Sequence, residues 1–319
     1  MMELISHPAF NMHVTGNHPE NGSRLTCLGD LPATELPYDE SILHIIHQED
    51  YIEHVRAYCA EGRALDSDTM TSPGSFKAAV YAANATVLAS ETHGFAVVRP
   101  PGHHAYPDHA SGFCLFNNVA IAAQRLVEQG KHVLLLDFDG HLGDGTCAIF
   151  DQSNRVLYWS LHQFPAFPGY GRATEIGKGS GEGFTFNVPL PPGSGDDIFM
   201  DAFHTLLPVA KQFDPDVVAV SAGFDAHQFD PLLDLRLTMD SYYEIGKILS
   251  ETFKNIFATL EGGYNTRDLP GCLYNFLDGI NGNPMRFHEE HTDSDFKVHQ
   301  QYDIDKQILL SKLKPYWTI

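Results

Sequence analysis

Short apolar runs alternate with longer amphipathic stretches along this sequence, and the alternation restricts the folds that the chain can adopt. Five runs are rich in Val, Ile, Leu and Phe, at residues 94–99, 132–137, 156–161, 217–222 and 256–261. Helix-like stretches lie between them, at 75–92, 115–128, 197–213 and 239–253. Continuous apolar strands separated by helices are typical of a parallel sheet covered on both faces. We therefore predict an α/β fold.

Polar and unusual residues come directly after four of the predicted strands. The first strand runs into RPPGHHA, the second ends in DFDGH, the fourth ends in SAGFDAH, and the fifth is followed by EGGYN. In open α/β folds, ligands bind outside the carboxyl ends of the strands, on loops that a rigid scaffold positions. Segments that are far apart in the sequence are thus expected to meet at one edge of the sheet.

The composition fits one globular unit. Hydrophobic residues make up 43% of the 319 residues, and no repeat, low-complexity tract or Pro/Ser-rich linker divides them, so we predict a single domain over residues 1–319. No apolar run reaches transmembrane length, and the first ten residues lack the regions of a signal peptide. We expect a cytoplasmic protein without membrane contact. The five scattered cysteines, with no CxxC pair, predict neither a disulfide framework nor a thiolate metal site.

The chain is strongly acidic, with 41 acidic and 20 basic residues and a formal net charge of −21. Phosphate binding depends on Lys and Arg, so this balance argues against nucleic acid as a direct ligand. The charge would steer a cationic substrate toward the protein, although an acidic surface also serves solubility alone. The 18 histidines are many for this length and point to metal or proton-transfer chemistry.

A candidate metal site begins where the second predicted strand ends. In an extended chain alternate side chains share a face, so Asp137, Asp139 and His141 can point the same way. Such a group at a buried strand end is costly unless a partner such as a metal satisfies it. Carboxylates and an imidazole, with Asp225 from a distant segment, are typical of catalytic zinc with an open position. The alternative for this segment alone is a strand end with solvated acids.

Two neighbouring histidines, His103 and His104, lie on a turn shaped by Gly and Pro. A histidine beside a catalytic metal can take a proton from the attacking water and later deliver it to a leaving amine. Such a histidine needs an orienting carboxylate on its other ring nitrogen, and Asp137 and Asp144 are available. Taken alone, the pair is equally compatible with a structural role.

Tyr264 follows two glycines after the fifth predicted strand. A phenol at this position can donate a hydrogen bond to the oxygen on which charge develops when water attacks a carbonyl. A Gly-Gly-Tyr turn is not specific by itself, because tyrosines in loops usually only pack.

Together these segments resemble the histone deacetylase family, including its bacterial amidohydrolase and acetylpolyamine deacetylase members. The matching motifs occur in family order over nearly the whole chain, which makes the resemblance highly specific. They are HPENGSRL (18–25), SPGSF (72–76), RPPGHHA (99–105), GFCLFNNVAIAA (112–123), DFDGHLGDGT (137–146), SLH (160–162), NVPLPPGSGD (187–196), SAGFDAHQFDPL (221–232) and EGGYN (261–265). The resemblance implies the arginase/deacetylase fold, a mainly parallel sheet of about eight strands flanked by helices.

The resemblance also implies two kinds of bound metal. Zinc would be held by Asp139, His141 and Asp225, with iron(II) as an alternative in the cell. Potassium would bind nearby, mostly through backbone oxygens. The matching positions are Asp137, Asp139, His141, Ser160 and Leu161 in a first site, and Phe150, Ser153 and Val156 in a second.

The catalytic roles follow from the same resemblance. His104 would be the general base and acid, with Asp144 as its orienting carboxylate. His103 would be the neighbouring electrostatic partner, oriented by Asp137. Tyr264 would polarise the substrate carbonyl and stabilise the tetrahedral oxyanion.

The resemblance implies a narrow tunnel for the aliphatic stem of the substrate. Phe113 and Phe167 would form its aromatic walls, and the Gly112 carbonyl would accept a substrate N–H. One position departs from the family pattern, because Leu142 stands where a second histidine usually follows His141. That residue is not a zinc ligand, so metal binding and activity are expected to persist, and only the packing behind the metal is in question.

Three functions remain open from the sequence. The first is a deacylase of acyl-lysine in proteins or peptides, the second a deacetylase of acetylated polyamines, and the third a binding protein for acylated ligands without catalysis. The complete set of metal, base and tyrosine positions weighs against the third. Polyamine-selective relatives place an acidic gatekeeper at the tunnel mouth, in one lineage directly after the Asp-Pro, where this chain has Leu232. Leucine there favours acyl-lysine, and the oligomeric state stays open.

Acidic residues elsewhere keep the polyamine alternative open. Asp66, Asp68 and Asp234 are all candidates to reach the rim of the tunnel. The simpler interpretation of each is an acid on a solvated loop.

Overall fold

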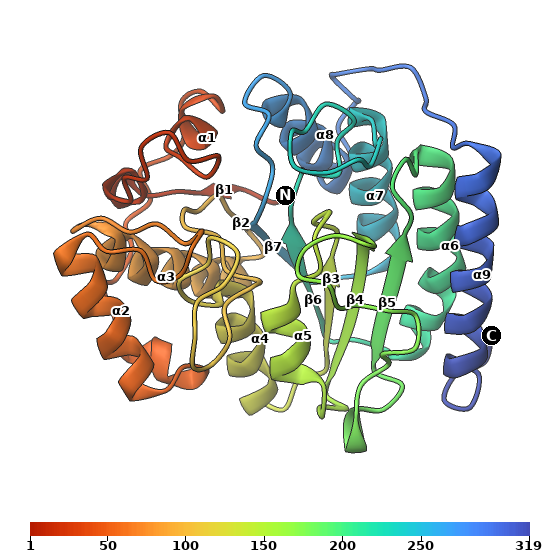
Figure 1. Cartoon of the computed structure of the whole chain (residues 1–319), viewed down its shortest axis with the longest axis horizontal. Coiled ribbons are helices and arrows are strands. Elements are labelled where there is room, and N and C mark those ends of the chain that lie inside the picture. Colours follow the sequence, from red (N-terminus) through yellow and green to blue (C-terminus); the bar gives the residue numbers. More distant parts are fainter.

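The computed structural model describes all 319 residues and contains one sheet of seven strands (Figure 1). All neighbouring strands are parallel. In spatial order they are β1 (Leu4–Ile5), β2 (Phe95–Ala96), β7 (Ile256–Leu260), β6 (Val217–Ala222), β3 (Val133–Asp137), β4 (Val156–Gln163) and β5 (Thr185–Leu190). The predicted α/β fold with a parallel sheet is confirmed, and the sheet has seven strands where about eight were expected.

The structure contains strands in all five of the apolar runs, and β1 and β5 are additional. The first run is paired over a shorter span than its sequence suggested, since β2 covers only Phe95–Ala96. The strand β5 contains Pro189, which cannot donate a ladder hydrogen bond. Because β5 is an edge strand, the missing donor is tolerated there.

Helices cover both faces of the sheet (Figure 1). They are α1 (Ser23–Thr26), α2 (Glu49–Glu61), α3 (Ser75–Thr92), α4 (Asn118–Glu128), α5 (Asp144–Phe150), α6 (Asp196–Gln212), α7 (Met239–Thr252), α8 (Leu269–Asn281) and α9 (Phe296–Leu313). Three short 3₁₀ helices span Pro8–Met12, Ser41–Ile45 and Gly179–Gly181. None of the helices has both the length and the apolar character that crossing a membrane requires.

The order of the strands reverses direction between β3 and β6. From β3 the chain moves through α5 to β4, whereas from β6 it moves through α7 to β7 on the other side. Parallel crossovers are right-handed, so α4 and α5 lie on one face of the sheet and α6 and α7 on the other. The loops after β3 and β6 therefore part at a crevice, which is where open α/β sheets bind their ligands.

Two buried phenylalanines anchor the loops that leave β3 and β6. Phe138 and Phe224 lie with ring centroids 5.8 Å apart, and Phe138 also contacts Tyr242 of α7 and Phe276 of α8. Phe138 lies between Asp137 and Asp139 in the sequence, and Phe224 directly precedes Asp225. The hydrophobic core thus fixes the backbone from which the predicted metal ligands project.

A buried cluster of charges connects the N-terminal segment to the rest of the molecule. The Glu20 carboxylate accepts a hydrogen bond from Arg99 Nη2 at 2.8 Å and lies 3.2 Å from His13 Nε2. Arg24 Nη1 lies 3.3 Å from the same carboxylate, and Arg24 Nε donates to the Gly263 carbonyl at 2.7 Å. Burial raises the pKa of Glu20, but Arg99 and His13 outweigh this and hold it well below its ordinary value.

This cluster predicts a pH-dependent stability. A carboxyl group with a lowered folded-state pKa stabilises the fold above its unfolded pKa of 4.5, and this contribution is lost as the pH falls through the lowered value. Glu20→Gln leaves buried arginines without their counter-charge, so we expect its unfolding free energy at pH 7 to fall by about 3–5 kcal/mol. Urea unfolding from pH 7 down to pH 3 measures this. The deficit should shrink below pH 4.5, the exposed Glu35→Gln should match the wild type, and a deficit that is constant with pH would contradict the assignment.

Candidate active site

The three predicted metal ligands meet at the crevice between β3 and β6. One ligand atom from each of Asp139, His141 and Asp225 lies within 4.8 Å of the others, and all three residues are buried. His141 Nδ1 lies 2.9 Å from Asp225 Oδ2 and 3.3 Å from Asp139 Oδ1. Asp137 is paired in register with Ser221 across the two strands. The parallel pairing therefore brings together residues that are 84 positions apart in the sequence.

The backbone around the ligands is a tight turn and not the extended strand that we expected as far as His141. The strand β3 ends at Asp137. Beyond it, the His141 amide donates to Asp139 Oδ1 at 2.8 Å, and the Gly140 amide donates to Asp225 Oδ1 at 2.7 Å. Asp137, at the end of the strand, accepts a hydrogen bond from the Asp139 amide at 3.2 Å and contacts His103 with its other oxygen. The grouping of Asp139 with His141 thus arises from backbone hydrogen bonds and not from strand alternation.

The charges of this group suit a bound cation. Burial raises the pKa of Asp225, and the neighbouring Asp139 carboxylate raises it further. Burial lowers the pKa of His141, but Asp225 and Asp139 outweigh this and raise it to about 10. Two buried carboxylates beside an imidazole are a donor set for a borderline divalent metal, which would relieve the repulsion between the acids. The group can therefore hold a metal ion.

Each histidine of the His103–His104 pair contacts its own carboxylate. His103 Nδ1 lies 3.1 Å from Asp137 Oδ2, and His104 Nδ1 lies 2.7 Å from Asp144 Oδ1. The two rings lie 4.0 Å apart. Because a carboxylate only accepts hydrogen bonds, Nδ1 of His104 carries the proton and its Nε2 is left as an acceptor.

The two histidines differ in charge. Burial and the neighbouring His103 lower the pKa of His104 to about 4, so this imidazole is neutral near pH 7 and can accept a proton. For His103 burial also lowers the pKa, but Asp139 and Asp137 outweigh it and raise the pKa well above the ordinary value. A neutral acceptor thus stands beside a positive charge.

A cleft of about 500 Å³ lies above these groups. It is lined by Asp66, Ser67, Asp68, His104, Ser111, Gly112, Phe113, His141, Phe167, Leu232 and Tyr264. All the residues predicted to contact substrate are thus among its walls. Of the three candidate rim acids, Asp66 and Asp68 line the cleft, whereas Asp234 does not and its amide donates to Gln163 Oε1 at 2.7 Å.

The wall at Gly112 and Phe113 has an unusual backbone. Gly112 has a φ of +50°, and a Cβ atom added there would collide with the His104 ring. Phe113 also has a positive φ, +71°, which is rare for a bulky residue and often marks a functional site. Its ring lies 5.6 Å from that of Tyr264. Only glycine allows the chain to pass this close to His104.

Tyr264 lines the cleft, and contacts with Asp230 and Arg24 hold the turn on which it lies. Its amide donates to Asp230 Oδ2 at 2.7 Å, and the Arg24 guanidinium lies 4.9 Å from its ring. Burial raises the pKa of Tyr264 well above its ordinary value, and the charges of Asp225 and Asp139 add to this despite the opposing effect of Arg24. The phenol therefore stays protonated and is a hydrogen-bond donor.

The predicted potassium positions lie on β3, on the metal-ligand turn, on β4 and on the connection from α5 to β4. Asp137 is paired with Ser160 across β3 and β4, and Leu161 follows Ser160 on β4. In the second predicted site, the Ser153 amide donates to the Phe150 carbonyl at 2.9 Å, and Val156 begins β4. Potassium binding stays a prediction.

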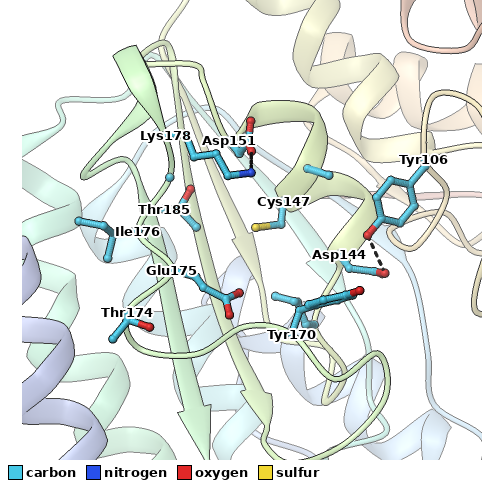
Figure 2. Close-up of a pocket in the computed structure, with 13 residues that line it drawn as sticks. Tyr106, Asp144, Cys147, Asp151, Tyr170, Thr174, Glu175, Ile176, Lys178 and Thr185 are labelled. Carbon is cyan, nitrogen blue, oxygen red and sulfur yellow. Dashed lines mark hydrogen bonds and ion pairs between the residues drawn. The ribbon is translucent and has the colours of Figure 1, made fainter.

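A second cavity, of about 430 Å³, lies behind Asp144 (Figure 2). Leu142, the position that differs from the family pattern, is 2% exposed and forms part of the wall of this cavity. Tyr106 also lines this cavity, and its hydroxyl donates to Asp144 Oδ2 at 3.0 Å. The position where the family usually has a second histidine is thus occupied by packed hydrocarbon.

Two residues of the site received no role from the sequence. Glu261 Oε2 accepts hydrogen bonds from the amides of Gly102 at 2.7 Å and His103 at 3.1 Å, so it holds the histidine turn. Arg24 donates to the carbonyls of Glu261 and Gly263 and holds the turn of Tyr264. Glu261 lies in the motif EGGYN and Arg24 in the motif HPENGSRL. A charged residue inside a matched motif is the signal by which the sequence could have identified each of them.

Comparisons with known proteins identify the family to which the chain belongs. A family model described as "Histone deacetylase domain" matches residues 18–280. The chain is 36% identical over 290 residues to a "Probable deacetylase" of Archaeoglobus fulgidus, covering 82% of this chain and 81% of that protein. It is 36% identical over 277 residues to the "Histone deacetylase-like amidohydrolase" of Pseudomonas aeruginosa, covering 82% and 73% respectively.

Plant proteins are also similar. The chain is 41% identical over 199 residues to "Histone deacetylase 10, chloroplastic" of Oryza sativa subsp. japonica, covering 60% of this chain but only 45% of that protein. The solved structure titled "Crystal Structure of HDA15 HD domain" superposes with a TM-score of 0.88 at 30% identity, covering 99% of this chain and 95% of the other. The similarity in fold thus extends over the whole sheet.

The ligand geometry predicts that Asp225→Ala abolishes metal retention. Removing one of three ligands leaves the set incomplete and His141 beside a single carboxylate. Elemental analysis of protein purified in zinc-containing buffer measures this, with a metal content near zero expected. Asp234→Ala, on the exposed loop nearby, is the matched control and should retain metal as the wild type does. A normal metal content in Asp225→Ala would refute the ligand assignment.

Proposed function

Since the chain belongs to the histone deacetylase family, we propose that it is a zinc-dependent deacetylase of acetyl-lysine side chains in peptides or proteins. Its relatives are named deacetylases or an amidohydrolase, and the reaction class is the hydrolysis of an amide C–N bond. The observation that carries the proposal is the group of three buried ligands with a neutral His104 and a protonated Tyr264 beside it in one cleft.

The residues of the chain would share the chemistry as follows. A divalent cation held by Asp139, His141 and Asp225 would supply Lewis acidity toward the acyl oxygen. His104, whose Nδ1–H is fixed by Asp144, would accept the proton of the attacking water at Nε2. The same proton would then be delivered to the departing amine.

Tyr264 and His103 would stabilise charge during the reaction. The Tyr264 phenol would donate a hydrogen bond to the acyl oxygen as it becomes negative. The positive His103, 4.0 Å from His104, disfavours a second positive charge there and so assists delivery of the proton to the amine. The aromatic walls Phe113 and Phe167 would enclose the aliphatic stem and exclude water.

Removal of the Tyr264 hydroxyl tests this assignment. We expect Tyr264→Phe to lower kcat by about 10²–10³-fold, which is typical for the loss of one oxyanion donor. Zinc content should not change, since the phenol is not a ligand. Steady-state kinetics on an acetyl-lysine peptide measures the effect, with the exposed Tyr316→Phe as a control. Full turnover by Tyr264→Phe would remove the tyrosine from the mechanism.

The rim of the cleft supports acyl-lysine as the substrate class. Leu232 lies at the mouth with 36% of its surface exposed, and Phe167 is 50% exposed. An apolar rim suits a peptide backbone with neighbouring side chains better than a second ammonium group. Asp66 has fewer free acceptor positions for a ligand, because its oxygens already accept hydrogen bonds from Thr69 and from the Asp68 amide.

One rim residue favours acetylated polyamines as a second candidate. The Asp68 side chain is 67% exposed, and its Oδ1 atom lies 3.3 Å from Nε2 of His18. The His18 ring in turn lies 4.5 Å from that of Phe113, so Asp68 stands close to the aromatic wall. A carboxylate at this place can attract the distant ammonium of a polyamine, and the net charge of −21 acts in the same direction.

A comparison of substrates decides between the candidates. We expect kcat/KM to be higher on an acetyl-lysine peptide than on acetylated putrescine, cadaverine or spermidine. Asp68→Asn should change kcat/KM for a neutral acetyl-lysine peptide by less than about threefold, which is the scale of an exposed charge. A tenfold preference for polyamines, lost in Asp68→Asn, would reverse the order. Failure of the zinc-loaded protein to hydrolyse any of these amides would favour the binding protein without catalysis.

A further inference from the structure

The Asp144 carboxylate lies between the catalytic cleft and the cavity behind it. Its Oδ1 atom is 2.7 Å from His104 Nδ1, whereas its Oδ2 atom accepts the hydrogen bond of Tyr106 at 3.0 Å. Figure 2 shows the Tyr106 ring at the cavity wall with its hydroxyl directed at this carboxylate. The side chain of Asp144 is only 6% exposed, so water contributes little to holding it.

A carboxylate with only one directional partner is poorly fixed. The terminal torsion of an aspartate is broad and nearly two-fold, so one hydrogen bond does not determine the plane of the group. Asp144 is the first residue of α5, a helix of 7 residues, and the helix fixes its backbone but not this torsion. The Tyr106 hydroxyl supplies the second direction. With both oxygens engaged, the plane of the carboxylate and hence the direction of His104 are set.

Tyr106 is itself held from three sides. Its ring stacks on that of His109 with centroids 4.2 Å apart and planes at 16°. Its amide donates to the His109 carbonyl at 3.0 Å. Its carbonyl lies 3.1 Å from His47 Nδ1, and His47 Nε2 accepts from the Asn117 amide, which leaves Nδ1 as the donor. The phenol therefore approaches Asp144 from a fixed backbone.

We propose that Tyr106 is a positioning residue for catalysis, which orients the general base His104 by fixing the plane of the Asp144 carboxylate. The hydroxyl touches neither the cleft lining nor the metal ligands, and it acts only through Asp144. Its donation also leaves Oδ1 as the single acceptor for the imidazole, which keeps Nε2 directed at the cleft. The proposal rests on the function assigned above to His104.

The kinetic test uses a variant that removes only one oxygen atom. Tyr106→Phe keeps the stacked ring, so we expect folding and metal content to be unchanged. We expect kcat to fall by about tenfold, which is the lower end of the loss of activity when a hydrogen-bond partner behind a functional side chain is removed. KM should stay within about twofold, because the substrate does not contact Tyr106. Tyr170→Phe is the matched control, since Tyr170 lines the same cavity and is 60% exposed; it should behave as the wild type does.

A double-mutant cycle separates positioning from general packing. If Tyr106 acts through Asp144, Tyr106→Phe should cause no further loss of kcat in an Asp144→Asn background. An equal tenfold loss in both backgrounds would overturn the proposal. So would wild-type kcat in Tyr106→Phe alone.

A spectroscopic measurement makes the test independent of turnover. In zinc-loaded protein labelled with ¹⁵N-histidine, the Nδ1–H of His104 should give a downfield proton resonance that Asp144→Ala removes. We expect Tyr106→Phe to shift or broaden this resonance and Tyr170→Phe to leave it in place. An unchanged resonance in Tyr106→Phe would refute the positioning role even if no substrate were hydrolysed. A shifted resonance without any turnover would instead support the positioning of His104 and refute the proposed reaction.

Discussion

The parallel pairing of β3 with β6 is the constraint on which the site depends. These neighbouring strands end in register, with Asp137 opposite Ser221, and the chain leaves them toward opposite faces of the sheet. The loops must therefore separate, and the turn at Asp139–His141 faces Asp225 across the gap. Phe138 and Phe224 bind the same two loops into the core. The same two short loops therefore pack into the core and carry the predicted metal ligands.

Around this crevice, most buried acids have a specific partner. Asp137 faces His103, Asp144 faces His104, and Glu261 accepts two backbone amides. Asp139 and Asp225 differ, because both contact the single imidazole of His141, and the Asp139 carboxylate raises the pKa of Asp225. Two buried carboxylates that share one imidazole are a donor set that suits a divalent cation. The other acids of this crevice already have partners of their own, so this group is the candidate metal site.

Much of the architecture could be predicted because it depends on local patterns. The apolar runs identified the central strands, and the positions of His103, His104, Asp225 and Tyr264 after strands placed them at one edge. Edge strands were harder, since β1 is only two residues long and β5 contains Pro189. The turn after Asp137 could not be predicted, because its direction comes from hydrogen bonds that the Gly140 and His141 amides donate to Asp225 and Asp139. Tyr106 carried no signal, since its contact with Asp144 exists only after the sheet has formed.

The contact between Arg24 and the turn of Tyr264 has a consequence for the biogenesis of the protein. The two partners, Arg24 and Gly263, are 239 residues apart in the sequence. During synthesis the N-terminal segment that carries Arg24 is therefore complete long before the turn that contains Gly263. Until then Arg24 lacks its carbonyl acceptors at Glu261 and Gly263, and the tyrosine that faces the cleft does not yet exist. A nascent or prematurely terminated chain therefore has no competent site. The candidate site is complete only when the first and the last matched motif, HPENGSRL and EGGYN, have come together.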